Sequence, residues 1–265
     1  MLAVCATPIG NLEDVTLRVL RELREADLVL CEDTRRTKRL LARHGIEARL
    51  LSYHEHNEAA RTAEVLPRLR AGERVALVSD AGMPAISDPG ARLIAAALGE
   101  GLPVTVLPGP SAVETALVAS GLVSERYRFV GYLPRGGAAL AAVWDELSSW
   151  PWSTIAFESP QRLPATLRSL ADRFPSRRAA VCRELTKQFE EVVRGTAAEL
   201  AKVFPDPPKG EIVLVVEGTE KVLDADAATA AVSELVDAGV PRRRAAEIVA
   251  RLTGVPRNTL YRRSL

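Results

Sequence analysis

Three loops rich in glycine, proline and polar residues each follow a short apolar run, and they constrain the fold more than any other feature. The longest loop, SDAGMPAISDPG at 79–90, comes directly after the apolar run 75–78. Similar loops, ATPIGN at 6–11 and LPGPSA at 107–112, follow the first and fifth apolar runs. Glycine lets a ligand approach the backbone and proline fixes the chain direction, while open α/β sheets bind ligands at the carboxyl ends of their strands. The loops therefore predict a cleft for a small polar molecule.

Strand-like and helical runs alternate through the first hundred residues. The expected strands are 2–6, 28–31, 49–51, 75–79 and 104–107, and the helices between them include 15–25, 57–71 and 91–99. Asp14 is placed to cap the first of these helices. Such alternation predicts a mostly parallel sheet with right-handed crossovers.

The pattern changes after a helix expected at 111–120. Further strands are expected at 128–132, 154–157, 179–183, 190–193 and 212–216. Since the segment between Arg183 and Glu190 is too short for a crossover helix, that pair should be antiparallel, which makes the second sheet mixed.

From Asp224 onward the pattern is helical. Helices are expected at 227–237, 241–252 and 256–263, with Pro241 and Pro256 at first helical positions. The predicted fold class is α/β: a mostly parallel N-terminal sheet, a mixed second sheet and a small helix-turn-helix-like tail. The domain boundaries that we expect are 1–109, 110–222 and 223–265.

Composition excludes several classes of protein. No uninterrupted apolar run reaches the roughly 20 residues of a membrane span, and the N-terminus lacks the basic lead of a signal peptide. Cys5, Cys31 and Cys182 are scattered and resemble buried small hydrophobic residues, so no disulfide framework or zinc site is expected. No clustered carboxylate or histidine pattern requires a metal. We expect a cytoplasmic protein that does not bind membranes.

Positive charge is concentrated in two places although the net charge is only +1. Residues 239–265 hold seven arginines against one acid, Glu247, and a second basic cluster lies at 35–39. Local basic faces suit contacts with phosphates, and equally suit ordinary solvated helix surfaces.

The sequence DAGMP at 80–84 stands where a dinucleotide fold would carry G-x-G-x-x-G. No second glycine allows a pyrophosphate to lie on a helix N-terminus, which argues against NAD or ATP. The pattern favours a ligand without phosphates, held by carboxylates and backbone amides, and S-adenosylmethionine fits this description.

Eight motifs in order resemble the tetrapyrrole methylase superfamily, which includes precorrin methylases and diphthine synthase, and within it the subfamily that methylates small-subunit ribosomal RNA. They are TPIGNL at 7–12, CEDTR at 31–35, SYHEHNE at 52–58, the 79–90 loop, LPGPSA at 107–112, FESPQR at 157–162, RELTK at 183–187 and KGE at 209–211. The resemblance covers the whole chain, including the tail. It implies S-adenosylmethionine-dependent 2′-O-methylation of a cytidine in the decoding region of 16S ribosomal RNA, by a homodimer acting on the small subunit.

The resemblance also assigns residues to roles. The cofactor-binding set it implies is Pro8, Asp80, Gly82, Pro84, Ile86, Ser111, Ala112, Phe157, Arg183, Gly210 and Glu211. RNA binding would come from Arg35, Arg36, Arg39, Arg242, Arg243, Arg244 and Arg257.

A ribose hydroxyl is a weak acid, so a base or a cation at the emerging alkoxide would help the transfer. We nominate Asp33 and Lys187 as catalytic, with His54, Glu58, Glu190 and Glu191 as further candidates. Two alternatives stay open: a related methylase acting on a tetrapyrrole or a protein side chain, and a metabolite-sensing nucleic-acid-binding regulator.

Overall fold

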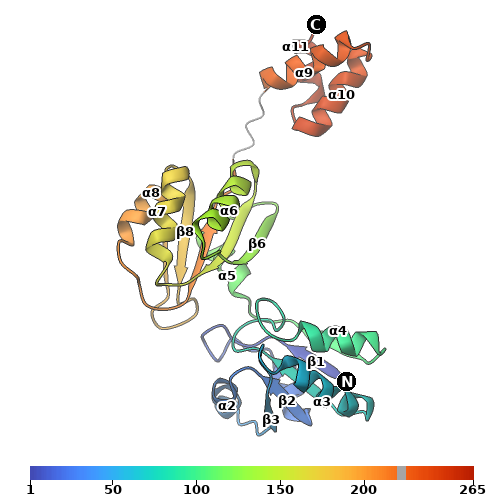
Figure 1. The fold of residues 1–265 in the computed structure, drawn as a ribbon, viewed down its shortest axis with the longest axis vertical. Helices are drawn as coiled ribbons and strands as arrows, with labels where there is room; N and C mark the ends of the chain where they lie inside the picture. Colours follow the sequence, from blue (N-terminus) through green and yellow to red (C-terminus); the bar gives the residue numbers. More distant parts are fainter. Residues whose placement is uncertain (220–224) are drawn as a thin grey trace. The chain divides into compact units, whose positions relative to one another are not determined.

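The computed structural model describes residues 1–219 and 225–265, which form two compact units, Met1–Gly218 and Thr219–Leu265. Figure 1 shows both units. The boundary expected between residues 222 and 223, like the helical start expected at Asp224, lies outside the described residues.

The first sheet has the strand order β3-β2-β4-β1-β5. Its strands are β1 (Leu2–Cys5), β2 (Leu28–Cys31), β3 (Leu50–Ser52), β4 (Val75–Val78) and β5 (Val104–Leu107). All four strand pairings are parallel. All five carboxyl ends therefore meet at one edge of the sheet, where the three loops begin.

Helices cover both faces of this sheet. They are α1 (Leu17–Glu25), α2 (Thr34–Arg43), α3 (Glu58–Arg70) and α4 (Ala91–Gly99). One core packs α3 and α4 against alternate strand residues, and the other packs α1 and α2 against the remaining ones. Burial on both faces explains why these strands read as continuous apolar runs. The mostly parallel sheet predicted from the alternation is confirmed and is parallel throughout.

The second sheet has the order β6-β7-β10-β8-β9. Its strands are β6 (Tyr127–Tyr132), β7 (Ser153–Glu158), β8 (Arg178–Arg183), β9 (Glu191–Thr196) and β10 (Ile212–Val216). The β6–β7 pair is parallel, and the pairs β7–β10, β10–β8 and β8–β9 are antiparallel. The mixed sheet and the antiparallel β8–β9 pair are thus confirmed.

One face of the second sheet is covered by α6 (Gly137–Ser149), α7 (Leu163–Arg173) and α8 (Ala197–Val203), and the other by α5 (Ala112–Ser120). The core beneath α5 also takes in Ile9, which comes from the loop after β1 and is 7% exposed. A side chain of the first α/β domain is therefore part of the second domain's core, and this contact fixes the β1 loop against the second sheet.

The tail unit is helical, as expected. It comprises α9 (Ala225–Asp237), α10 (Arg242–Thr253) and α11 (Arg257–Arg263), which share a small core of their own. Pro241 and Pro256 occupy the N-cap positions, one residue before the first helical positions at which we expected them. Gly254 ends α10 with a left-handed φ of 79°.

Besides shifts of one or two residues at several element ends, two further details differ from the expectation. The first helix is capped by Thr16, whose side chain accepts a hydrogen bond from the Val19 amide, and not by Asp14. Strand β9 runs to Thr196, three residues beyond its expected end, because Thr196 caps α8 and the strand continues to that cap.

All three cysteines are buried free thiols. Within the described residues, no helix has the length and apolar character to cross a membrane, and no cluster of potential metal ligands occurs.

Candidate active site

The larger of two adjoining cavities in the first unit, about 560 Å³, lies where the loops after β4 and β5 meet the carboxyl end of β7 and the loop before β10. Its volume falls in the range of small-molecule sites. It is lined by Ile9, Arg36, Asp80, Ala81, Gly82, Met83, Ile86, Ser87, Asp88, Ser111, Ala112, Val113, Tyr132, Phe157, Glu158, Ser159, Pro160, Cys182, Leu185, Gly210, Glu211, Ile212 and Val213.

The charge of this lining is predominantly negative. It includes the carboxyl groups of Asp80, Asp88, Glu158 and Glu211, against one guanidinium, that of Arg36. Such a lining favours a cationic ligand and repels phosphates. The geometry agrees with the absence of a dinucleotide fingerprint in the sequence.

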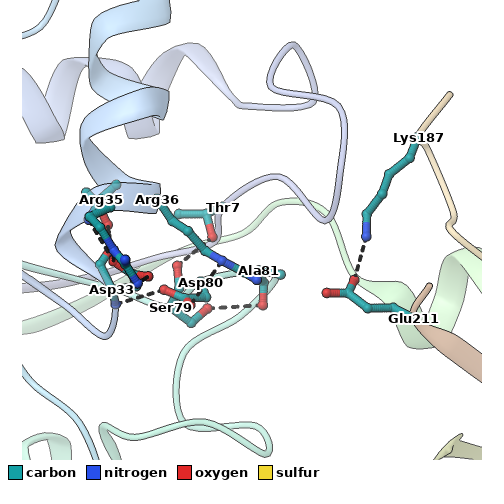
Figure 2. Close-up of polar contacts among 10 residues, drawn as sticks. Thr7, Asp33, Arg35, Arg36, Ser79, Asp80, Ala81, Lys187 and Glu211 are labelled. Atoms are coloured by element: carbon teal, nitrogen blue, oxygen red, sulfur yellow. Dashed lines mark hydrogen bonds and ion pairs between the residues drawn. The ribbon is translucent and has the colours of Figure 1, made fainter. Parts of the chain in front are cut away.

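Asp80 is fixed where the loops after β1, β2 and β4 converge (Figure 2). Its Oδ1 accepts a hydrogen bond from the Asp33 amide at 2.9 Å, and its Oδ2 lies 3.5 Å from Arg36 Nε. The β1 and β4 loops are joined by the reciprocal backbone hydrogen bonds of Thr7 and Gly82, at 2.9 and 3.0 Å. Since Gly82 has a φ of 76°, this loop conformation suits glycine.

Asp88, farther along the same loop, is the cavity carboxyl with the most perturbed environment. Burial, followed by the charge of Glu32, raises its pKa from 3.8 to about 6, while Ser79 works in the opposite direction as a hydrogen-bond donor. Two non-glycine residues of this loop, Ala85 and Ser87, have left-handed φ values of 70° and 62°. Strained backbone and a perturbed carboxyl together are typical of a functional site.

A second, smaller cavity of about 370 Å³ adjoins the first. It is lined by Thr7, Pro8, Ile9, Gly10, Leu12, Arg36, Thr37, Arg39, Leu40, Ser79, Asp80, Ala81, Lys187 and Glu211. The two cavities share the residues Ile9, Arg36, Asp80, Ala81 and Glu211. Its cations come from α2 and from the loop between β8 and β9.

Lys187 lies in this smaller cavity and is held by two carboxylates, of which Figure 2 shows that of Glu211. Its Nζ donates to Glu184 Oε1 at 2.8 Å and to Glu211 Oε2 at 2.9 Å. Burial by itself lowers the pKa of Lys187, but the hydrogen bonds to the two carboxylates outweigh it and raise the pKa. The side chain is therefore a fixed ammonium cation and not a proton acceptor at neutral pH.

Close backbone approach positions Lys187. A Cβ on Gly10 would lie 2.5 Å from Lys187 Cγ and 2.8 Å from the Leu185 carbonyl oxygen. Gly210 has a φ of 102°, and a Cβ there would lie 2.4 Å from Glu184 Cγ. The Lys187 loop thus packs against two glycines from separate loops, and side chains at those positions would displace it.

Asp33, the other nominated catalytic residue, lines neither cavity. It caps α2: its Oδ1 accepts from the Arg35 amide at 2.8 Å, and its Oδ2 pairs with Arg35 Nη2 at 3.0 Å. The Arg35 side chain is the main cause that lowers the pKa of Asp33 to about 2. Such a carboxylate is a poor base, and the part of Asp33 that reaches the site is its amide on Asp80.

The further base candidates have hydrogen-bond or ion-pair partners. Glu58 Oε1 accepts from the Tyr53 hydroxyl at 3.2 Å and from the Gly90 amide at 3.1 Å, so it holds the end of the 79–90 loop. Glu190 accepts from the Thr186 amide, Glu191 pairs with Arg183 at 2.9 Å, and His54 contacts Asn57 at 3.1 Å. These contacts fix loops, although His54 Nδ1 is buried without a hydrogen-bond partner among the described residues.

The structure brings most of the expected cofactor residues together. Asp80, Gly82, Ile86, Ser111, Ala112, Phe157, Gly210 and Glu211 line the larger cavity, and Pro8 lines the smaller one. Pro84 is buried and lines neither, and Arg183 points its Nη1 to the Lys209 carbonyl oxygen at 3.1 Å. Both therefore act on the loops that form the wall.

The expected RNA-binding arginines separate into three settings. Arg36 and Arg39 line the smaller cavity, whereas Arg35 is exposed and paired with Asp33. The others lie in the tail unit, Arg242, Arg243 and Arg244 at the start of α10 and Arg257 at the start of α11.

Residues 1–201 match the family model of tetrapyrrole (corrin/porphyrin) methylases. The chain belongs to this family. Residues 222–265 match a second model, the RsmI C-terminal HTH domain, which accounts for the tail of this tetrapyrrole methylase.

Curated relatives place the chain more narrowly within the tetrapyrrole methylases. A ribosomal RNA small subunit methyltransferase I from Mesorhizobium japonicum is 44% identical over 100% of this chain and 91% of its own length. The protein of the same name from Pseudomonas aeruginosa is 40% identical over 100% of this chain and 96% of its own. The chain thus belongs to the ribosomal RNA small subunit methyltransferase I group.

Solved structures show the same fold at low sequence identity. Diphthine synthase aligns with a TM-score of 0.66 at 17% identity, covering 82% of this chain and 89% of its own. A uroporphyrin-III C-methyltransferase from Thermus thermophilus, solved with S-adenosyl homocysteine, aligns with a TM-score of 0.56 at 21% identity, covering 82% and 96%. The predicted tetrapyrrole methylase architecture is confirmed.

Sequence reasoning missed three residues of this site. Asp88 stands in the quoted 79–90 loop, and its burial beside Glu32 is visible only in three dimensions. Glu184 is the acid three residues before Lys187, a spacing that could have indicated the pair. Gly10 follows Pro8 in the β1 loop, but nothing in the sequence shows that Lys187 packs on it.

Proposed function

We propose that this tetrapyrrole methylase uses S-adenosylmethionine to methylate the ribose 2′-oxygen of a cytidine in the decoding region of 16S ribosomal RNA, within the small ribosomal subunit. The observation that carries the proposal is the full-length likeness to ribosomal RNA small subunit methyltransferase I, combined with a carboxylate-lined cavity beside a cationic one. We further propose a cytoplasmic homodimer, a proposal that rests on the family resemblance.

The donor set of the larger cavity fits the cofactor. S-adenosylmethionine supplies a methyl group on a positively charged sulfur, together with an ammonium group. Asp80 and Asp88 offer carboxylates toward these charges. Phe157 offers an aromatic wall, and its ring packs edge-on against the rings of Phe129 and Tyr132, with centroid distances of 4.8 and 5.5 Å. We assign the loop residues Gly82, Ile86, Ser111 and Ala112 and the Gly210–Glu211 turn to the same pocket.

Lys187 then supports the reaction as a cation. An ammonium held on two carboxylates and facing the shared wall of the cavities stabilises negative charge on an attacking ribose oxygen. Its fixed position costs no reorganisation when that charge develops. The protein's other contribution is to place the hydroxyl in line with the methyl group and away from bulk water.

The basic residues outside the cavities serve binding of the subunit. Arg243, Arg244 and Arg257 are exposed at the starts of α10 and α11, and Arg244 pairs only with Glu247 three residues on, among the described residues. We assign these arginines and Arg242 to contacts with the RNA backbone, which position an enzyme without specifying sequence.

Methyl transfer to isolated small subunits tests the proposal. The protein is incubated with radiolabelled S-adenosylmethionine and subunits from cells that lack the modification, and label is located in RNA and in protein. We expect label in 16S RNA at one cytidine, with the adjacent 3′ phosphodiester resistant to alkali because the 2′-oxygen is blocked. Asp80→Ala serves as the inactive control.

Each other outcome contradicts the proposal. Label in a base, at another nucleotide or in a ribosomal protein refutes the stated acceptor, and label in an added tetrapyrrole supports the first alternative. Tight binding of S-adenosylmethionine and RNA without methyl transfer supports the second alternative, a metabolite-sensing nucleic-acid-binding regulator.

A further inference from the structure

The two adjoining cavities differ in charge, and this difference suggests different ligands. The larger cavity has four carboxyl groups and one guanidinium. The smaller has Arg36, Arg39 and Lys187 against only Asp80 and Glu211. A ligand that carries phosphate is repelled by the first lining and attracted by the second.

Pairing shows which charges of each lining are free. In the larger cavity three carboxylates are paired, Asp80 with Arg36, Glu158 with Arg162 and Glu211 with Lys187, which leaves Asp88 without an ion-pair partner among the described residues. In the smaller cavity, Lys187 is matched by Glu211 at 2.9 Å and Arg36 by Asp80 at 3.5 Å. Arg39 has no hydrogen-bond or ion-pair partner among the residues that the structure describes, although it lies one helical turn from Arg36 and lines the same cavity. A guanidinium left unpaired at a cavity is suited to bind phosphate in a bidentate manner.

The shared wall gives the two ligands a meeting point. Ile9, Asp80 and Ala81 border both cavities, so a group in the smaller one faces a group in the larger one across this wall. The smaller cavity, about 370 Å³, is at the lower end of the range for small-molecule sites, and so suits one nucleotide better than a stretch of helix. Enzymes that do chemistry on a nucleobase take the target nucleotide out of its stack into an active-site pocket, which is a precedent for a pocket that holds one nucleotide.

We propose that the smaller cavity is the acceptor site for a single extruded nucleotide, with Arg39 binding its phosphate and Lys187 lying beside its ribose. This inference rests on the proposed RNA methylation and adds to it the place where the RNA enters. The inference gives different roles to two arginines of the basic cluster at 35–39: Arg39 binds phosphate, and Arg35 fixes the loop before α2.

Substitution of Arg39 tests the assignment, with a neighbouring lysine as the matched control. Lys38 is exposed on the same helix, lines neither cavity and carries the same charge. For Arg39→Ala we expect the KM for small subunits to rise about tenfold while the dissociation constant for S-adenosylmethionine stays within twofold. The slope of log KM against log salt should fall by about 1, the loss of one phosphate contact. Lys38→Ala should leave both constants near wild type.

A second variant fills the cavity without a change of charge. Leu12 lines only the smaller of the two cavities and is half-buried. Leu12→Trp should reduce transfer to subunits at least tenfold, again with unchanged affinity for S-adenosylmethionine measured by calorimetry, which also reports that the variant is folded.

The outcomes separate this inference from the proposed function. If the wild-type protein does not methylate subunits, the proposed function fails. If it does, equal effects of Arg39→Ala and Lys38→Ala overturn the acceptor site, because they show dependence on overall charge alone. A tenfold loss of affinity for S-adenosylmethionine in Leu12→Trp or Arg39→Ala also overturns it, because the smaller cavity would then belong to the cofactor.

Discussion

Asp88→Asn should stabilise the cofactor-free protein at neutral pH and leave it unchanged in acid. Burial and the charge of Glu32 raise the pKa of Asp88 from 3.8 to about 6, so ionised Asp88 opposes folding. At about 1.36 kcal/mol per pKa unit, the difference corresponds to an upper limit of about 3 kcal/mol. The side chain is partly exposed, so solvent screening reduces the expected gain to about 1–2 kcal/mol.

The sign follows from proton linkage. Below about pH 4, Asp88 is protonated in both the folded and the unfolded chain, so the substitution has little effect. As the pH rises from about 4 to 6, the unfolded chain releases its proton first and the wild type loses stability, a loss that is complete above pH 6. The advantage of Asp88→Asn should therefore grow over this interval and then remain constant.

Urea unfolding followed by circular dichroism at pH 4, 5, 6 and 8 measures the effect. Asp206→Asn, at an exposed carboxyl in the loop after α8, is the matched control and should show no such trend. At pH 8 Asp88→Asn should also bind S-adenosylmethionine more weakly. An ionised carboxylate that lowers the stability of the fold is typical of a ligand-binding residue, and the substitution removes its charge. A stability difference that is the same at pH 4 and pH 8, or a loss of stability at pH 8, would refute the reasoning.

Three further variants test the positions of the site elements. Gly10→Ala should displace Lys187 and so lower kcat about tenfold to a hundredfold, with cofactor affinity largely kept. The control is Gly137→Ala in α6, where a Cβ meets nothing within 4 Å, and it should leave kcat unchanged. Equal kcat values for the two variants would contradict the packing argument. Asp80→Asn, which keeps an acceptor for the Asp33 amide, should weaken S-adenosylmethionine binding at least tenfold in calorimetry, and unchanged affinity would remove Asp80 from the pocket. A chain ending at Gly218 should keep cofactor affinity, since Met1–Gly218 is a compact unit, but show a raised KM for subunits; wild-type kinetics would exclude an RNA role for the tail.

Periodicity predicted the fold well because the strands are short apolar runs bounded by strong turn residues. The parallel first sheet and the antiparallel β8–β9 pair followed from run lengths and loop lengths alone. The error at the first helix has a local cause: Asp14 and Thr16 are both good capping residues, and only the backbone path decides which side chain reaches the Val19 amide.

The site was less predictable, because its chemistry depends on contacts between distant loops. The resemblance assigned Asp80 to the cofactor set, its loop is recognisable from a strand end and glycine, and its role stays a prediction. The protonation of Asp33 and Lys187 could not be predicted, because each depends on a partner: Arg35 makes Asp33 a poor base, and Glu184 with Glu211 keeps Lys187 protonated. Sequence places such residues near a site but cannot determine their protonation.

The protonation of these residues bears on how the reaction is assisted. Neither nominated catalytic group can accept a proton readily at neutral pH, whereas Lys187 and Arg39 place positive charge at the smaller cavity. In the proposed reaction, assistance to a weakly acidic ribose hydroxyl would come mainly from cations that stabilise the developing alkoxide, not from a dedicated base. Carboxylates line the larger cavity, to which we assign the cationic methyl donor. The shared wall around Asp80 thus separates a cavity suited to positive charge from one suited to negative charge, and in the proposed reaction the methyl group crosses between them.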